Sequence, residues 1–127
     1  MTRRAISTTD APAAIGPYSQ AIADGGILFC SGQLGLDPAT GRLVEGDTAA
    51  QAERALRNLG AVLDAAGCSF ANVAKITIFL AEMADFAAVN RVYMGFFPDP
   101  APARSTVAVK QLPIGALIEI EALAVRP

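Results

Sequence analysis

The sequence predicts an α+β fold, a ferredoxin-like two-layer sandwich in which two helices pack on one face of a mixed sheet. Two segments repeat apolar residues at helical spacing, and several short segments are rich in β-branched residues. Turn signals separate these segments in the order hairpin, helix, strand, helix, strand, strand. Because the 127 residues contain no repeat and no linker, we expect one domain over residues 1–127.

The first elements are a predicted hairpin. Residues 1–20 are polar and punctuated by Pro and Gly, so no strand is expected there. A turn at Asp24-Gly25-Gly26 precedes a strand over residues 27–31, which residues 32–36 continue. The glycines of this continuation predict a β-bulge or a close approach of backbone.

The first helix is predicted over residues 48–66. Thr48-Ala49-Ala50-Gln51 reads as a capping box, in which the threonine bonds a free N–H and the glutamine reaches back. Gly67 should end the helix in a left-handed conformation. An apolar stripe at helical spacing should face the sheet; it consists of Ala52, Ala55, Leu56, Leu59, Val62, Leu63 and Ala66.

The second half of the chain should add three strands and one helix. Residues 75–80 form a β-branched strand, and a helix starts near Asp85 as its N-cap and stops at Pro98. The last two strands cover residues 106–109 and 117–125. Asn90 is expected on or beside the apolar face of this second helix, which comprises Phe86, Val89, Tyr93, Phe96 and Phe97.

The apolar content predicts a homo-oligomer. The hydrophobic fraction is 53% and the mean hydropathy is +0.40, yet no run approaches the length of a membrane span. The strands over residues 75–80 and 106–109 are apolar on both faces, whereas two helices can cover one face of the sheet. We therefore expect other subunits, and no membrane, on the uncovered face.

Composition excludes several function classes. A net charge of −2 without a basic stripe argues against a nucleic-acid partner. The absence of histidine rules out Ser-His-Asp and Cys-His catalysis and His-ligated metals, and no phosphate loop is present. No metal or cofactor is expected. Cys30 and Cys68 match no metal or redox spacing, and the first residues do not resemble a signal peptide, so we expect reduced thiols and a cytoplasmic location.

Charged residues inside apolar strands mark the candidate site. Arg104 stands at the mouth of one strand, and Glu119 and Glu121 stand inside another. A guanidinium can bind a carboxylate, and a glutamate can take a proton from water, which together suit hydrolysis of a small anionic substrate. A structural ion pair or a solvated strand face is the alternative interpretation. Strand alternation places both glutamates on one face, opposite Ile118 and Ile120, and does not choose between them.

The chain resembles the Rid family of reactive intermediate deaminases, formerly grouped under YjgF, essentially from end to end. The resemblance is carried by Ala11–Gln20, Ser31–Gln33, Phe86–Asn90, Pro102–Ser105 and Ile118–Ala122. It implies a chorismate-mutase-like fold with a mixed six-stranded sheet, and a homotrimer with active sites between subunits. It also implies cofactor-independent hydrolysis of 2-iminobutanoate and 2-iminopropanoate to 2-oxo acids and ammonia.

The resemblance assigns roles by position. Arg104 would bind the substrate carboxylate, and Glu119 rather than Glu121 would activate the attacking water. Many bacterial members have a cysteine where this chain has Thr106, so a shift in substrate preference is expected. The other substrate-binding positions that the resemblance implies are Tyr18, Ser31, Gly32 and Asn90.

Three other functions compete with the deaminase. A regulatory module could sense 2-oxo acids through Arg104 without turnover. A holdase chaperone and a ribonuclease are also attached to the family. The acidic balance and the missing histidines weigh against the ribonuclease.

Overall fold

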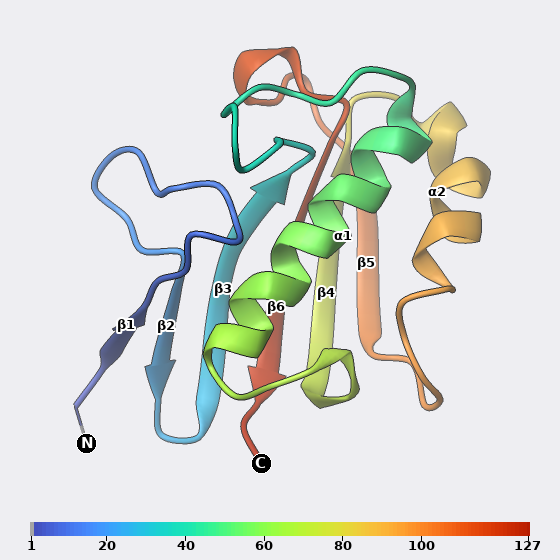
Figure 1. The fold of residues 1–127 in the computed structure, drawn as a ribbon. Coiled ribbons are helices and arrows are strands. Elements are labelled where there is room, and N and C mark those ends of the chain that lie inside the picture. Colours follow the sequence, from blue (N-terminus) through green and yellow to red (C-terminus); the bar gives the residue numbers. More distant parts are fainter. Residues whose placement is uncertain (1) are drawn as a thin grey trace.

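The computed structural model describes residues 2–127, which fold into a mixed six-stranded sheet with two α-helices (Figure 1). The strand order is β1-β2-β3-β6-β4-β5, and every neighbouring pair is antiparallel except β4 and β5. The strands are β1 (Arg4–Ile6), β2 (Ala21–Asp24), β3 (Ile27–Leu34), β4 (Val73–Leu80), β5 (Ala103–Ala108) and β6 (Ile118–Val125). The helices are α1 (Thr48–Ala65) and α2 (Phe86–Tyr93), with 3₁₀ turns at Phe70–Asn72, Met83–Asp85 and Pro113–Gly115.

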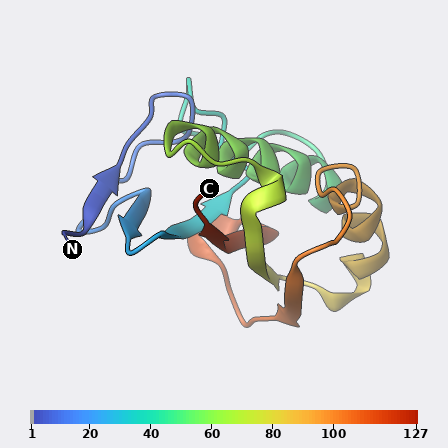
Figure 2. The same cartoon turned by 90° about the horizontal axis from the view of Figure 1, so that it is seen from below.

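Both helices lie on one face of the sheet, which confirms the predicted two-layer α+β class (Figure 2). The hydrophobic core lies between the helices and the sheet, because the apolar stripe of α1 faces the inward side chains of the central strands. Leu56, Leu59 and Leu63 are fully buried there, each stabilising the fold by roughly 1.5–3 kcal/mol. Their partners across the layer include Ile76, Ile78, Ile118 and Ile120, all fully buried.

The other face of the sheet carries no helix among the described residues (Figure 2). We call this surface the open face. Strand alternation sends every second residue of β6 there, and the apolar ones stay exposed because nothing packs over them. Its large apolar side chains, between 39% and 55% exposed, are Ile27, Phe29, Val107, Leu123 and Val125.

The predicted capping box of α1 is wrong. Asp47 is the N-cap and accepts a hydrogen bond from the Ala50 N–H at 3.0 Å. Thr48 and Gln51 face the interior and bond other elements instead: the Thr48 hydroxyl donates to Asp85, and Gln51 accepts from the Leu117 N–H. Both side chains that were predicted to cap the helix therefore form tertiary hydrogen bonds instead.

The end of α1 is as predicted. Gly67 adopts φ +76°, and the Cys68 N–H donates to the Leu63 carbonyl at 2.9 Å. This is the bonding pattern of a Schellman cap, in which glycine is favoured because a side chain would be strained. The helix accordingly stops within one residue of the prediction.

Helix α2 is shorter than the sequence predicted. It ends at Tyr93 rather than running to Pro98, because Gly95 follows and Phe96 and Phe97 turn back to pack on Phe70. Asp85 occupies the N-cap position of α2 as predicted, but its side chain makes no capping bond, since the carboxylate accepts the Thr48 hydroxyl. Neither helix of the described residues is long and apolar enough to cross a membrane.

The N-terminal third contains one strand that was not predicted and one bulge that was. Strand β1 was not predicted from pattern because Ile6 is its one buried residue, so the sequence shows no alternation. The predicted bulge is present: the pairing of β3 with β6 shifts by one residue between Cys30 and Gln33. Ser31 and Gly32 lie in this bulge.

Candidate active site

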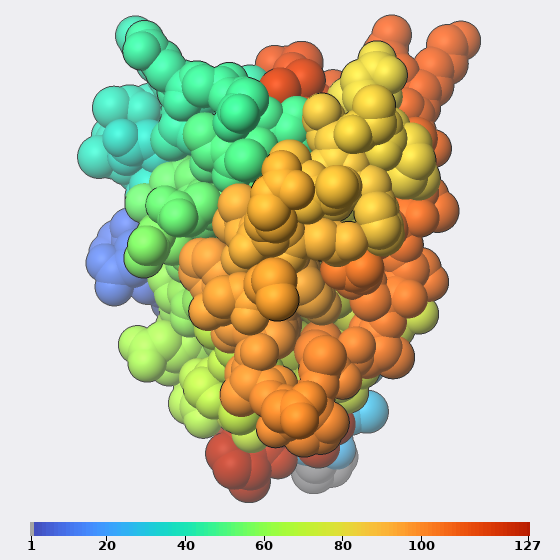
Figure 3. Space-filling model, turned by 90° about the vertical axis from the view of Figure 1, so that its right-hand side faces the viewer, coloured from blue at the N-terminus to red at the C-terminus, as the bar shows by residue number. Residues whose placement is uncertain are grey.

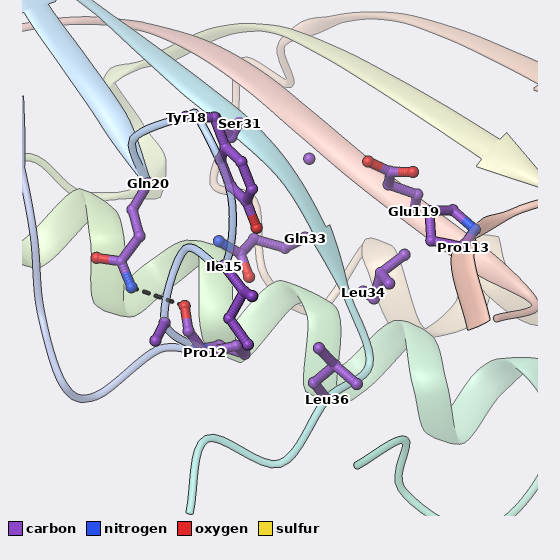
Figure 4. Close-up of a pocket in the computed structure, with 12 residues that line it drawn as sticks. Pro12, Ile15, Tyr18, Gln20, Ser31, Gln33, Leu34, Leu36, Pro113 and Glu119 are labelled. Atoms are coloured by element: carbon purple, nitrogen blue, oxygen red, sulfur yellow. Dashed lines mark hydrogen bonds between the residues drawn. The ribbon is translucent and has the colours of Figure 1, made fainter. Parts of the chain in front are cut away.

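The structure divides the predicted site residues into two groups. One group lines a pocket of about 440 Å³ between the loop that joins β1 to β2, strand β3 and Glu119 of β6, which we call the Glu119 pocket (Figure 4). The other group lies between β5 and α2, and we call it the Arg104 cradle. Tyr18, Ser31, Gly32 and Glu119 belong to the pocket, and Asn90, Arg104 and Thr106 belong to the cradle.

The two groups lie on opposite faces of the sheet. Arg104 is paired with Ile76 of β4, and Glu119 is paired with Phe79 of the same strand. Residues three apart on a strand point to opposite faces, and paired residues share a face. Arg104 therefore points to the helix side and Glu119 to the open side, so one chain does not bring the two side chains together.

The Glu119 carboxylate lies directly against the backbone of Gly32. A Cβ placed on Gly32 would collide with the carboxylate, so no residue with a side chain fits there without moving Glu119. The bulge of β3 produces this close approach. The sequence signal was the glycine inside an apolar strand.

Partial burial raises the pKa of the Glu119 carboxyl, and the negative charge of nearby Glu121 raises it further. The group thus holds its proton at a higher pH than an exposed glutamate. Such a carboxylate, once ionised, is a better proton acceptor than one in water. The pocket therefore contains a side chain suited to general base chemistry.

A loop between β1 and β2 places Tyr18 on the far side of the pocket from Glu119 (Figure 4). Gly16 has φ +124°, and the Tyr18 N–H donates to the Gly16 carbonyl at 2.9 Å. Buried Gln20 ties this loop down by accepting from the Thr8 N–H at 2.7 Å and donating to the Pro12 carbonyl at 2.8 Å. Sequence reasoning missed this role of Gln20.

Ser31 connects the bulge to the same loop. Its hydroxyl donates to the Ser19 carbonyl at 2.6 Å, and its N–H donates to the Gln20 carbonyl at 3.0 Å. The hydroxyl oxygen keeps a lone pair that can accept another hydrogen bond. The remaining walls are largely apolar and were not predicted as site residues; they include Pro12, Ala13, Ile15, Leu34, Leu36 and Pro113.

In the Arg104 cradle, three residues on one face of α2 surround the guanidinium. Arg104 Nη1 donates to Asn90 Oδ1 at 2.8 Å. The guanidinium carbon lies 4.7 Å from the centre of the Tyr93 ring and 5.4 Å from that of Phe86. Sequence reasoning placed Phe86 and Tyr93 only on the apolar face of the helix, and their spacing around Asn90 was the signal available.

Thr106 lies two residues beyond Arg104 on β5, on the same face of the strand. Its hydroxyl is buried and has no hydrogen-bond partner in the described part of the chain. The Tyr93 hydroxyl is in the same situation. Burial raises the pKa of Tyr93, and both the positive charge of Arg104 and the approach of its N–H donors to the Tyr93 hydroxyl oppose that rise.

No cluster of three or more His, Cys, Asp or Glu side chains within residues 2–127 could hold a metal. Cys30 and Cys68 are both free and buried. Burial is the main cause that raises the pKa of the Cys30 thiol to about 12, and the charge of nearby Cys68 is the second cause. A protonated buried thiol is a poor nucleophile. The groups available for chemistry at the site are a guanidinium, a carboxylate, hydroxyls and backbone N–H groups.

Known proteins resemble this chain over nearly its whole length. The family model described as Endoribonuclease L-PSP matches residues 8–126. A Mus musculus protein named 2-iminobutanoate/2-iminopropanoate deaminase is 52% identical over 124 residues, covering 98% of this chain and 92% of that protein.

Solved structures give the same result. YyfA of the conserved Rid protein family from Yersinia pestis has a TM-score of 0.93 and 46% identity, covering 98% of this chain and 99% of that chain. E. coli TdcF with bound serine has a TM-score of 0.92 and 42% identity, covering 98% and 99%. The chain therefore belongs to the Endoribonuclease L-PSP family, the family of the Rid and YjgF proteins that its sequence segments resemble.

Proposed function

We propose that this protein is a deaminase that hydrolyses small 2-imino acids, such as 2-iminobutanoate and 2-iminopropanoate, to 2-oxo acids and ammonia. The observation that carries the proposal is the pair of prepared groups: a guanidinium held by α2 and a partly buried carboxylate with a raised pKa. The name of the mouse relative supports the same reaction. The serine bound to E. coli TdcF supports a small ligand that carries a carboxylate.

Arg104 provides substrate binding in this mechanism. Its planar donors match the two oxygens of a carboxylate, and Asn90 occupies one Nη1 donor while leaving others for the ligand. Binding the carboxylate fixes the imine carbon relative to the pocket. Orientation of this kind can contribute a large share of the rate.

Glu119 provides the proton transfer. Its carboxylate takes a proton from a water whose oxygen attacks the imine carbon and passes that proton to the imine nitrogen, so a C–O bond replaces the C=N π bond and the tetrahedral intermediate carries a hydroxyl and an amino group. The same carboxylate then moves the hydroxyl proton to the amino nitrogen; the C–N bond breaks as the C=O bond forms, and ammonia and the 2-oxo acid leave. Tyr18, Ser31 and Gly32 would position the water and the substrate with hydroxyl and N–H groups.

The proposal includes a homotrimer in which Arg104 of one subunit faces Glu119 of the next. Opposite-face placement of the two side chains supports a site shared between chains. The exposed apolar residues of the open face support burial of that surface. If the surface around Arg104 on one subunit contacts the different surface around Glu119 on the next, the same contact can be repeated around a closed ring of subunits. The family resemblance implies that this ring contains three subunits.

A cytoplasmic location also belongs to the proposal. Cys30 and Cys68 are both free, which suits a reducing compartment. The absence of a basic stripe gives no support to a nucleic-acid partner.

Ammonia release from an imine generated in situ tests the reaction. The protein should accelerate release, and Glu119→Gln should lower kcat by about 10²–10⁴, the usual effect of losing an acid–base group. Glu121→Gln is the matched control on the same strand face and should stay within a few-fold. Equal activities of the two variants would contradict the assignment. Binding of 2-oxobutanoate without turnover would favour a regulatory module.

Mixing two inactive variants tests the shared site. Subunits of Arg104→Ala and Glu119→Gln, unfolded together and refolded as mixed oligomers, should regain about a quarter of the intact sites if each site takes one residue from each neighbour. Each variant refolded alone is the control. Recovery of no activity in verified mixed trimers would place both residues in a single-chain site.

A further inference from the structure

Tyr93 is a buried residue of α2 whose position packing alone does not explain. Its side chain is 6% exposed and lies against the Phe97 ring, with ring centres 4.4 Å apart. Packing of this kind needs no hydroxyl, yet the residue carries one that is buried and makes no hydrogen bond of good geometry, although the guanidinium of Arg104 lies near enough to affect its pKa as a hydrogen-bond donor would. Buried polar groups are nearly always bonded, so an unpartnered one calls for an explanation.

The environment of the Tyr93 ring points to Arg104. The guanidinium lies over this ring at 4.7 Å and also near the Phe86 ring at 5.4 Å. Aromatic faces attract a guanidinium, and the attraction grows when water is excluded. Phe86, Asn90 and Tyr93 are spaced i, i+4 and i+7, so one face of α2 presents two rings and one amide to the same cation.

The three contacts restrain different motions of the guanidinium. The two rings limit its rotation out of plane, and the Asn90 oxygen fixes the direction of one N–H. A two-point bond to a carboxylate requires both its plane and its direction. A guanidinium held in this way has lost much of its freedom before the ligand arrives, which favours binding.

We propose that Tyr93 is a positioning residue for Arg104: its ring fixes the plane of the guanidinium, and its hydroxyl accepts an N–H of Arg104 when the arginine engages a carboxylate. The inference rests on the proposed function, because it takes Arg104 as the carboxylate-binding group. It explains why an otherwise apolar packing position carries a hydroxyl next to a cation.

Isothermal titration with two ligands of the same shape tests the inference. 2-Oxobutanoate carries the carboxylate, whereas 2-oxobutanamide replaces it with a neutral amide. Tyr93→Leu should weaken binding of the acid about tenfold or more and change binding of the amide by less than twofold. Tyr93→Phe keeps the ring and should weaken acid binding by roughly two- to fivefold. In the deaminase assay, the Tyr93→Leu loss should appear mainly in KM.

Phe70→Leu is the matched control, because Phe70 packs in the same aromatic cluster against Phe96 and Phe97 without contacting Arg104. It should leave the preference for acid over amide unchanged. If Tyr93→Leu weakened both ligands equally, or weakened neither, the positioning role would be overturned. Tyr93→Phe matching the unsubstituted protein would remove the hydroxyl from the proposal.

Arg104→Ala separates this inference from the proposed function. This substitution should abolish the preference for the acid over the amide. Adding Tyr93→Leu to Arg104→Ala should then weaken binding of the acid no further, because the two residues act as one unit. A full additional loss in the double variant would overturn the positioning role. If Arg104→Ala kept the preference for the acid, the proposed role of Arg104 would fail while the packing of Tyr93 stood.

Discussion

The Arg104 cradle and the Glu119 pocket prepare a charged side chain in opposite ways. The cradle surrounds its cation with favourable contacts: an amide oxygen at 2.8 Å and two aromatic rings. The pocket partly buries its anion, places it against Gly32 and keeps Glu121 nearby, so its pKa rises. One group is stabilised as an ion, and the other is kept ready to accept a proton.

This difference matches the needs of binding and of catalysis. A binding group works best when it is rigid and permanently charged, as arginine is. A base works best when its pKa approaches the working pH, which requires an environment that disfavours its charge. We expect substitutions to act mainly on binding in the cradle and mainly on rate in the pocket.

Replacing the cradle cation should have the largest effect on binding. Arg104→Ala should weaken binding of 2-oxobutanoate and lower kcat/KM. Each loss should correspond to a free energy of about 2–5 kcal/mol, the scale for a lost charged contact. Arg104→Lys should restore only part, because lysine lacks the planar fork. Titration calorimetry and the ammonia assay measure both. Normal binding of the oxo acid by Arg104→Ala would remove the binding role.

A methyl group at Gly32 should have the next largest effect. Gly32→Ala places a Cβ where the Glu119 carboxylate now lies, so the base must move. We expect kcat to fall by roughly 10–100-fold, the scale of a misplacement near 1 Å, with affinity for 2-oxobutanoate less affected. Gly95→Ala is the control, since a Cβ there meets only ordinary contact. Full activity of Gly32→Ala would show that the carboxylate position is not critical.

A smaller effect should follow from removing the second carboxylate. Glu119 acts as a base only when ionised, so kcat/KM should fall as the pH drops through its raised pKa. Glu121→Gln removes one of the two causes of that rise and should move the acid limb of the pH profile to lower pH. The shift should be modest because burial is the larger cause. An acid limb that stays in place would exclude Glu119 as its source.

The smallest expected effect concerns stability. Because the pKa of Glu119 is higher in the folded chain than in the unfolded one, ionising it opposes folding, and this cost appears as the pH rises through the raised value. Glu119→Gln removes the cost, so Tm at pH 8 should increase by roughly 1–3 °C. At a pH below the ordinary glutamate pKa the increase should vanish. A lower Tm at pH 8 would contradict a destabilising role for this carboxylate.

Local patterns predicted the order of the main elements and the faces of the strands. The apolar stripe of α1 and the alternation in β6 each depend on one segment, and both appear in the structure. Thr48 and Gln51 were misassigned because capping residues also serve as tertiary partners, and local sequence does not reveal Asp85 or Leu117.

The two-part division of the site lay beyond the sequence. Whether Arg104 and Glu119 share a face depends on how β5 and β6 pair with β4 between them. A shift of one residue in either pairing would reverse the outcome, and periodicity within a strand does not fix the register between strands. The aromatic contacts of Arg104 depend in turn on how the side chains of α2 pack against Arg104 of β5, on the side of the molecule that Figure 3 presents.

The buried thiols have a consequence for chemical durability. The chain contains no histidine, and its lysines are Lys75 and Lys110. Cys30 is buried beneath the helix layer, and its pKa of about 12 keeps the thiol protonated. Few side chains are therefore available to be alkylated by an electrophilic compound. A protein of this composition can meet reactive imines repeatedly and keep its mass unchanged, which mass spectrometry after prolonged turnover would record. The shortage of reactive nucleophiles would thus protect the protein from the imines that it is proposed to hydrolyse.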